Sequence, residues 1–98
     1  MHTETACQAL KAGKCLQVSY DGFMRIVEVH AVGFTAEGNA VMRVWQVSGG
    51  SSSNEPVGWK LLTLAEARAS AIASEASAAP RRGYRRGDPA MSRIVCQI

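Results

Sequence analysis

The stretch from residue 14 to residue 64 constrains the fold most, because short runs of alternating apolar and polar residues are separated there by turn-forming residues. Residues 15–20 show the two-residue period of a half-buried strand. The dipeptide Asp21-Gly22 follows at once and is typical of a two-residue hairpin. Three further runs fit strands, at residues 23–32, 40–47 and 58–63. Several short strands at this spacing predict a small antiparallel barrel.

The segments on either side of these strands predict short helices. Residues 4–12 fit a helix that ends at Gly13. Asp88-Pro89 is typical of a helix start, so residues 89–98 are expected to form a terminal helix. A helical turn at 64–68, a short closing strand near 71–73 and an extended basic connection over 74–88 complete the layout. We therefore expect a mainly β fold, with residues 1–98 as one domain and residues 14–73 as its barrel. A bend or bulge is expected near Glu28, where both faces of the strand mix polar and apolar residues.

Length and cysteine content limit the class of protein. At 98 residues the chain is sufficient for one small core. No apolar run approaches the roughly 20 residues that cross a bilayer, and the first residues do not resemble a secretory signal. The three cysteines, Cys7, Cys15 and Cys96, match no metal or redox spacing. We expect buried free thiols in a reducing cytoplasm, no membrane contact, no bound metal and no cofactor.

Positive charge is concentrated near the end of the chain. Residues 81–98 carry five arginines and one aspartate, a net charge of +4, whereas residues 1–80 carry −1. The segment 81–87 interleaves arginines with glycines and Tyr84, a composition that suits contact with phosphates and stacking on bases. It is also typical of a plain solvated linker in which Tyr84 docks on the barrel. The candidate polyanion-binding residues are Arg81, Arg82, Tyr84, Arg85 and Arg86.

Large aromatic and cationic residues recur along the strands. Trp45 and Trp59 are expected on neighbouring strands, either as core anchors or as a stacking surface for a base. His30 fits a hydrogen-bonded structural residue or a ligand contact. No combination of nucleophile, base and orienting group is visible, so we do not expect an enzyme. The candidate ligand contacts are Arg25, His30, Arg43, Trp45 and Lys60.

The order of these features resembles the WYL domain family. The similarity lies in the helix and strand over residues 9–20, in Arg25-Ile26-Val27-Glu28, in the aromatic strand 41–45 and in Trp59-Lys60-Leu61. The chain also resembles small bacterial proteins with a Gly-Trp-Lys strand and a tail like residues 80–94. These resemblances imply a small Sm/SH3-like antiparallel barrel that binds or senses nucleotide or nucleic-acid ligands.

Two functions from different classes remain open at this point. The first is a stand-alone, non-enzymatic WYL-like binding or sensor module for an anionic ligand, either a nucleotide or single-stranded nucleic acid. The alternative is a protein-interaction or homo-oligomer-forming SH3-like barrel with no small ligand, in which the basic segment wraps a neighbouring molecule. A concave cationic site with exposed aromatic residues favours the first function, and an exposed apolar patch favours the second.

Overall fold

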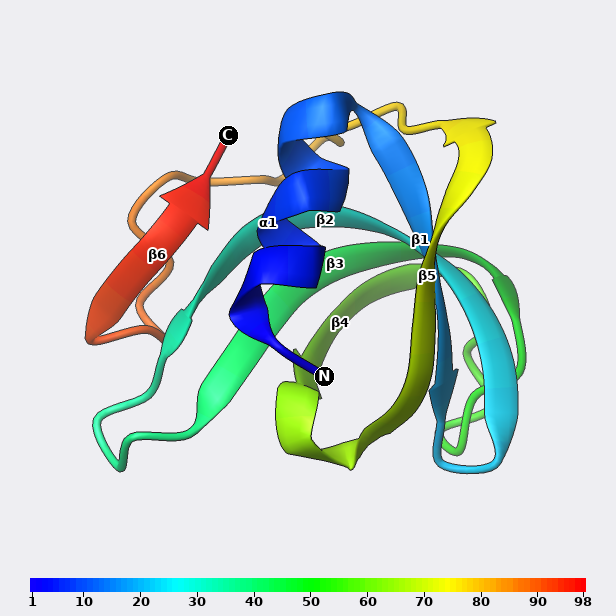
Figure 1. Cartoon of the computed structure of the whole chain (residues 1–98), viewed down its shortest axis with the longest axis horizontal. Helices are drawn as coiled ribbons and strands as arrows, with labels where there is room; N and C mark the ends of the chain where they lie inside the picture. The colour runs from blue at the N-terminus through cyan, green and yellow to red at the C-terminus, as the bar shows by residue number, and fades with distance from the viewer.

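Six strands form one antiparallel sheet in the computed structural model, which describes residues 1–98 (Figure 1). The strands are β1 (Lys14–Tyr20), β2 (Phe23–Phe34), β3 (Ala40–Gly49), β4 (Gly58–Thr63), β5 (Ala67–Ala76) and β6 (Arg93–Gln97). Their order is β4-β3-β2-β1-β5, and β6 pairs with β2 beside this path. The predicted mainly β fold is confirmed. The sheet is not closed, because β4 and β5 are not hydrogen-bonded to each other, so it is a barrel only in a loose sense.

The turn and the helix end that were predicted from local sequence are present in the structure. Asp21 and Gly22 join β1 to β2, and both have positive φ angles, 53° and 77°. That conformation twists a two-residue turn to match the twist of its strands. The helix α1 (Thr3–Ala12) ends at Gly13, whose φ of 65° is left-handed. A single 3-10 turn, η1 (Leu64–Glu66), joins β4 to β5 where a helical turn was expected.

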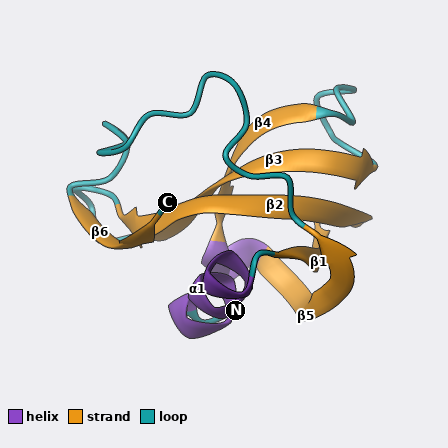
Figure 2. Cartoon of the chain, turned by 90° about the horizontal axis from the view of Figure 1, so that it is seen from above, coloured by secondary structure: helices purple, strands orange, loops and turns teal.

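The main core lies between α1 and one face of the sheet. Its buried residues come from the helix, from β1 to β4 and from η1. They are Ala6, Cys7, Ala9, Leu16, Val18, Val27, Val29, Val32, Met42, Val44, Leu62 and Leu64. Seen from above, α1 lies on one side of β2 and β3, and the loop of residues 77–92 crosses the other side (Figure 2). We call residues 77–92 the tail.

Strand β2 is long and irregular, which gives its two halves different partners. Its register with β3 shifts between Ile26 and Val27 and again between Val29 and Ala31. These irregularities confirm the bend expected near Glu28. The first half of β2 pairs with β1, and the last residues, Ala31–Phe34, pair with β6. Because side chains alternate between the two faces of a strand, Val27 and Val29 enter the core, while Glu28 and His30 are buried outside the main core cluster.

The predicted terminal helix over 89–98 is wrong, because residues 93–97 form strand β6. The Asp88-Pro89 signal does begin a turn: the Ala90 N–H donates to Asp88 Oδ1, and the Met91 N–H donates to the Asp88 carbonyl. The chain then reaches the part of β2 beyond the end of β1. The backbone N–H and C=O groups of β2 that have no partner on β1 can hydrogen-bond to another strand. A short segment with β-branched residues forms that strand. The closing strand expected near 71–73 is also longer, since β5 spans ten residues.

Two of the three cysteines form a disulfide bond, which corrects the expectation of three free thiols. Cys7 of α1 is bonded to Cys96 of β6, across a sequence separation of 89 residues. Closing so long a loop stabilises a fold by about 4–5 kcal/mol in the chain-entropy model. Cys15 is free and buried, as expected. No helix in the structure has the length and apolar composition needed to cross a membrane.

At Gly33 the backbone of β6 lies very close to β2. A Cβ atom there would overlap the Arg93 carbonyl oxygen and would lie 2.9 Å from Met91 Sδ. We therefore expect Gly33→Ala to lower the free energy of unfolding by about 1–3 kcal/mol, the usual cost of overpacking. Urea denaturation measures this change, with Ser48→Ala at an exposed position of β3 as the control. An unchanged denaturation midpoint for Gly33→Ala contradicts the close approach.

Candidate functional site

The tail is fixed to the sheet by the buried carboxylate of Glu28. Arg81 Nε donates to Glu28 Oε1 at 2.7 Å, and Arg81 Nη2 donates to Oε2 at 3.2 Å. The Ala78 N–H also donates to Oε2, at 2.6 Å. The side chain of Glu28 is only 2% exposed, so these donors replace the water that a carboxylate otherwise needs. Burial alone would raise the pKa of Glu28, but the Arg81 and Ala78 hydrogen bonds and the Arg81 charge outweigh it and lower the pKa.

His30 forms the second anchor of the tail. Its Nε2 accepts the Arg81 N–H at 2.9 Å, and its Nδ1 lies 3.0 Å from the Glu28 carbonyl oxygen. Because one ring nitrogen accepts and the other faces an acceptor, the pattern fits neutral imidazole with its proton on Nδ1. Burial lowers the pKa of His30, although the Glu28 hydrogen bond and charge act in the opposite direction.

Aromatic rings surround His30 on this face of the sheet. Trp45 and Trp59 are direct cross-strand partners on β3 and β4, with centroids 5.4 Å apart and an interplanar angle of 89°. Trp59 also meets the His30 ring edge-on at 4.7 Å, and Tyr84 of the tail lies 5.2 Å from the same ring. The Arg81 guanidinium lies 5.5 Å from the centroid of Trp45. The tail therefore packs on an aromatic platform as well as on polar anchors.

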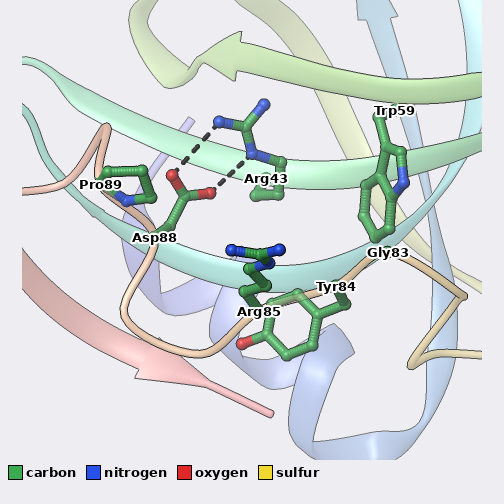
Figure 3. Close-up of a pocket in the computed structure, with 7 residues that line it drawn as sticks. All are labelled: Arg43, Trp59, Gly83, Tyr84, Arg85, Asp88 and Pro89. Carbon is green, nitrogen blue, oxygen red and sulfur yellow. Dashed lines mark hydrogen bonds and ion pairs between the residues drawn. The ribbon is translucent and has the colours of Figure 1, made fainter.

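A cleft of about 330 Å³ lies between this platform and the tail (Figure 3). Its lining residues are Arg43, Trp59, Gly83, Tyr84, Arg85, Asp88 and Pro89. Gly83 has a φ of 95°, and a Cβ atom there would lie 3.3 Å from Trp59 Nε1. A glycine at this position lets the tail pass close to the indole.

One arginine of the cleft is paired and the other is not. Arg43 Nε donates to Asp88 Oδ2 at 2.6 Å, and Arg43 Nη2 donates to Oδ1 at 3.2 Å. The Arg43 hydrogen bonds lower the pKa of Asp88 against the opposing effect of burial. Arg85 is exposed and forms no hydrogen bond or ion pair within the chain. The cleft thus carries a net positive charge that an anion can reach.

The far rim of the cleft depends on the last residues of the described chain. The Tyr84 hydroxyl and Arg86 Nε both donate to the Ile98 backbone oxygen, each at 3.1 Å. The Gly87 N–H donates to Gln97 Oε1 at 2.9 Å. Residues 97 and 98 therefore hold the Tyr84 side of the cleft in place.

The five ligand contacts predicted on the strands do not form one site. Of these, only Arg43 lines the cleft, whereas Trp45 lies near Arg81 and His30 is fully buried next to Tyr84. Arg25 is also buried, donates to Gln46 Oε1 at 3.3 Å, and lies 5.1 Å from the Tyr20 ring. Lys60 donates to Ser51 and Ser53 of the loop between β3 and β4.

The predicted tail residues also divide into distinct roles. Tyr84 and Arg85 line the cleft, whereas Arg81 and Arg86 are hydrogen-bonded within the fold. Arg82 is exposed and has no partner. The sequence interpretation missed Gly83, Asp88 and Pro89 as lining residues. The one acidic residue in an arginine-rich segment was the available signal for the Arg43–Asp88 pair.

A scan against protein-family models found no match for this chain, and searches of curated proteins and of solved structures found none either.

The neutral state of His30 makes the stability of the fold dependent on pH. Its folded-state pKa lies below the ordinary value of 6.5, so the unfolded chain binds the proton first as the pH falls. The free energy of unfolding should therefore decrease below about pH 6.5, by up to about 1.4 kcal/mol per pH unit, until the pH reaches the folded pKa. Chemical denaturation at several pH values between about 7.5 and 5.5 measures this slope.

The matched control for this slope is His30→Gln, which keeps an acceptor for the Arg81 N–H and has no proton to gain. Its free energy of unfolding should change little over the same range. Glu28 and Asp88 do not interfere, because both pKa values are lowered and their contributions are lost only at more acidic pH. An equal slope in the two proteins contradicts the assignment to His30.

Proposed function

We propose that this protein is a non-enzymatic binding module for a small anionic ligand of the nucleotide class. The observation that carries the proposal is a cleft in which two aromatic side chains, Trp59 and Tyr84, lie beside Arg85, an arginine without a partner in the chain. Aromatic side chains supply stacking surfaces for a base, worth about 1–3 kcal/mol each. A free guanidinium supplies paired donors that match a phosphate.

The size and charge of the cleft support a ligand no larger than a mononucleotide. Its volume of about 330 Å³ is at the lower end of the range of roughly 300–1,000 Å³ typical of small-molecule sites. Arg43 and Asp88 neutralise each other, so Arg85 provides the net positive charge. This proposal retains the WYL-like binding or sensor module that the sequence suggested, with a different set of contact residues.

The lining chemistry favours binding over catalysis. Asp88 is bound to Arg43 in two hydrogen bonds, which leaves its carboxylate poorly suited to accept a proton. Burial raises the pKa of the Tyr84 phenol, so this group remains protonated near neutral pH. The other lining residues are glycine, proline, tryptophan and arginine, none of which is an ordinary nucleophile or base.

Titration with AMP, adenosine and inorganic phosphate, followed by tryptophan fluorescence and calorimetry, tests this function. AMP should bind more tightly than adenosine or phosphate. We expect Arg85→Gln to weaken AMP binding by about tenfold or more, the value of a hydrogen bond to a charged group, and to leave adenosine binding unchanged. Arg82→Gln is the matched control, because Arg82 is an exposed tail arginine outside the cleft.

Two results contradict this assignment. One is the absence of binding of all three probes at low salt. The other is an equal loss of AMP affinity in Arg82→Gln and Arg85→Gln, which indicates diffuse charge attraction instead of a site. Tighter binding of a short single-stranded oligonucleotide, weakened by both substitutions, favours single-stranded nucleic acid as the ligand.

The free edge of β5 favours a second candidate function, assembly with another protein chain or with a second copy. β5 spans ten residues, contains no proline and pairs only with β1. Ile72 on this strand and Met24 on β2 are large apolar side chains with 41% and 51% exposure. Exposed strand edges of this kind accept further strands. Sedimentation at increasing protein concentration tests self-assembly, and Ile72→Lys should abolish any dimer that forms through this edge.

A further inference from the structure

The Cys7–Cys96 disulfide lines a groove at the edge of the main core. The groove has a volume of about 250 Å³ and includes both cysteines, with Gln8, Lys11 and Val95 among its other lining residues. Cys7 is buried, whereas Cys96 is partly exposed. A small thiol can therefore approach Cys96 from the groove, where the neighbouring Val95 is 48% exposed.

Two opposite charges, Lys11 and Glu4, line the groove beside the disulfide. Lys11 lies four residues after Cys7 on α1 and lines the same groove. Residues at this spacing are neighbours on a helix surface. The Lys11 ammonium group stabilises a thiolate that leaves on Cys7, whereas the Glu4 carboxylate has the opposite effect. Cys15 has no comparable setting, because it is buried in the fold and its Sγ faces the Ala76 carbonyl oxygen.

The strand that carries Cys96 is paired at one edge only. β6 has five residues and pairs with β2 alone, through Ala31–Phe34. Beyond the strand, the Ile98 N–H donates to the His30 carbonyl oxygen. The disulfide is the one covalent bond that connects β6 to α1. Without it, β6 is held by its ladder with β2, by the packing of Ile94 on a small buried cluster, and by the hydrogen bonds of residues 97 and 98.

The residues directly after Cys96 hold the rim of the nucleotide cleft. Gln97 accepts the Gly87 N–H, and the Ile98 backbone oxygen accepts the Tyr84 hydroxyl and Arg86 Nε. Tyr84 is therefore hydrogen-bonded to a residue only two positions after Cys96, so a displacement of the end of β6 would also displace Tyr84. The side chains of Glu28 and His30 anchor the other end of the tail at Arg81.

We propose that Cys7–Cys96 is a thiol–disulfide exchange site whose reduction by a small-molecule thiol loosens the Tyr84 rim and weakens ligand binding in the cleft. The attacking thiolate forms a bond to Cys96 Sγ, the Cys7–Cys96 bond breaks, and its electron pair leaves on Cys7 Sγ, which then takes up a proton. A second thiol attacks the mixed disulfide and releases Cys96 as a thiol. Two reductant thiols become one disulfide, and the protein gains two electrons and two protons. The effect on binding rests on the proposed function.

The test compares the oxidised protein, the protein reduced with glutathione, and a Cys7→Ser/Cys96→Ser variant. Alkylation under native conditions, read by mass spectrometry, should label the groove cysteines only after reduction. Amide exchange should increase about tenfold or more over residues 84–98 and remain unchanged in β1 and β3. AMP affinity should fall in the reduced protein and in the double variant. Cys15→Ala is the control and should respond to glutathione like the unchanged protein.

Several outcomes overturn the proposal. If glutathione does not reduce the disulfide in the native state, the proposal of a thiol–disulfide exchange site is wrong. Faster amide exchange throughout the chain, with loss of the circular dichroism signal, shows that the disulfide stabilises the whole fold and does not act on residues 84–98 alone. Faster exchange confined to 84–98 with unchanged AMP affinity removes the coupling to the cleft. If the oxidised protein binds no nucleotide, the proposed function fails, and alkylation and amide exchange still decide whether the exchange site and rim loosening exist.

Discussion

The arrangement of the tail depends on the hydrogen bonds and the ion pair that the buried carboxylate of Glu28 forms with it. A carboxylate taken out of water must be paired and hydrogen-bonded, and here Arg81 and the Ala78 N–H supply the donors. These bonds fix where the tail meets the sheet, and His30 fixes the backbone of Arg81 beside them. The position of Gly83, Tyr84 and Arg85 over the sheet follows from this anchor.

The two faces of the sheet pack against different parts of the chain because their side chains differ. One face is apolar and packs on α1, which forms the main core. The other carries Glu28 and His30 together with the indoles of Trp45 and Trp59, and it needs the tail to cover it. The cleft exists because this cover is incomplete: it closes around His30 and stays open between Trp59 and Asp88.

Much of the fold was predictable because its signals are local. The period of residues 15–20, the Asp21-Gly22 turn and the Gly13 helix end act over a few residues, so the sequence pattern carries them. The terminal strand was not predictable in the same way. Asp88-Pro89 favours a helix, and the turn begins as expected, but the free part of β2 offers backbone partners that no local signal reveals.

The sequence by itself determined the mainly β class, a helix over residues 4–12, the hairpin and the presence of arginines and aromatic residues in the segment that lines the cleft. Tertiary structure alone decided which of those arginines are free: Arg81 and Arg86 are bound within the fold, and Arg85 is not. It also decided the pairing of Cys7 with Cys96, 89 residues apart. The physical reason is the range of each interaction, since periodicity acts between neighbours in the chain, whereas ion pairs and disulfides depend on which distant groups the folded sheet brings together.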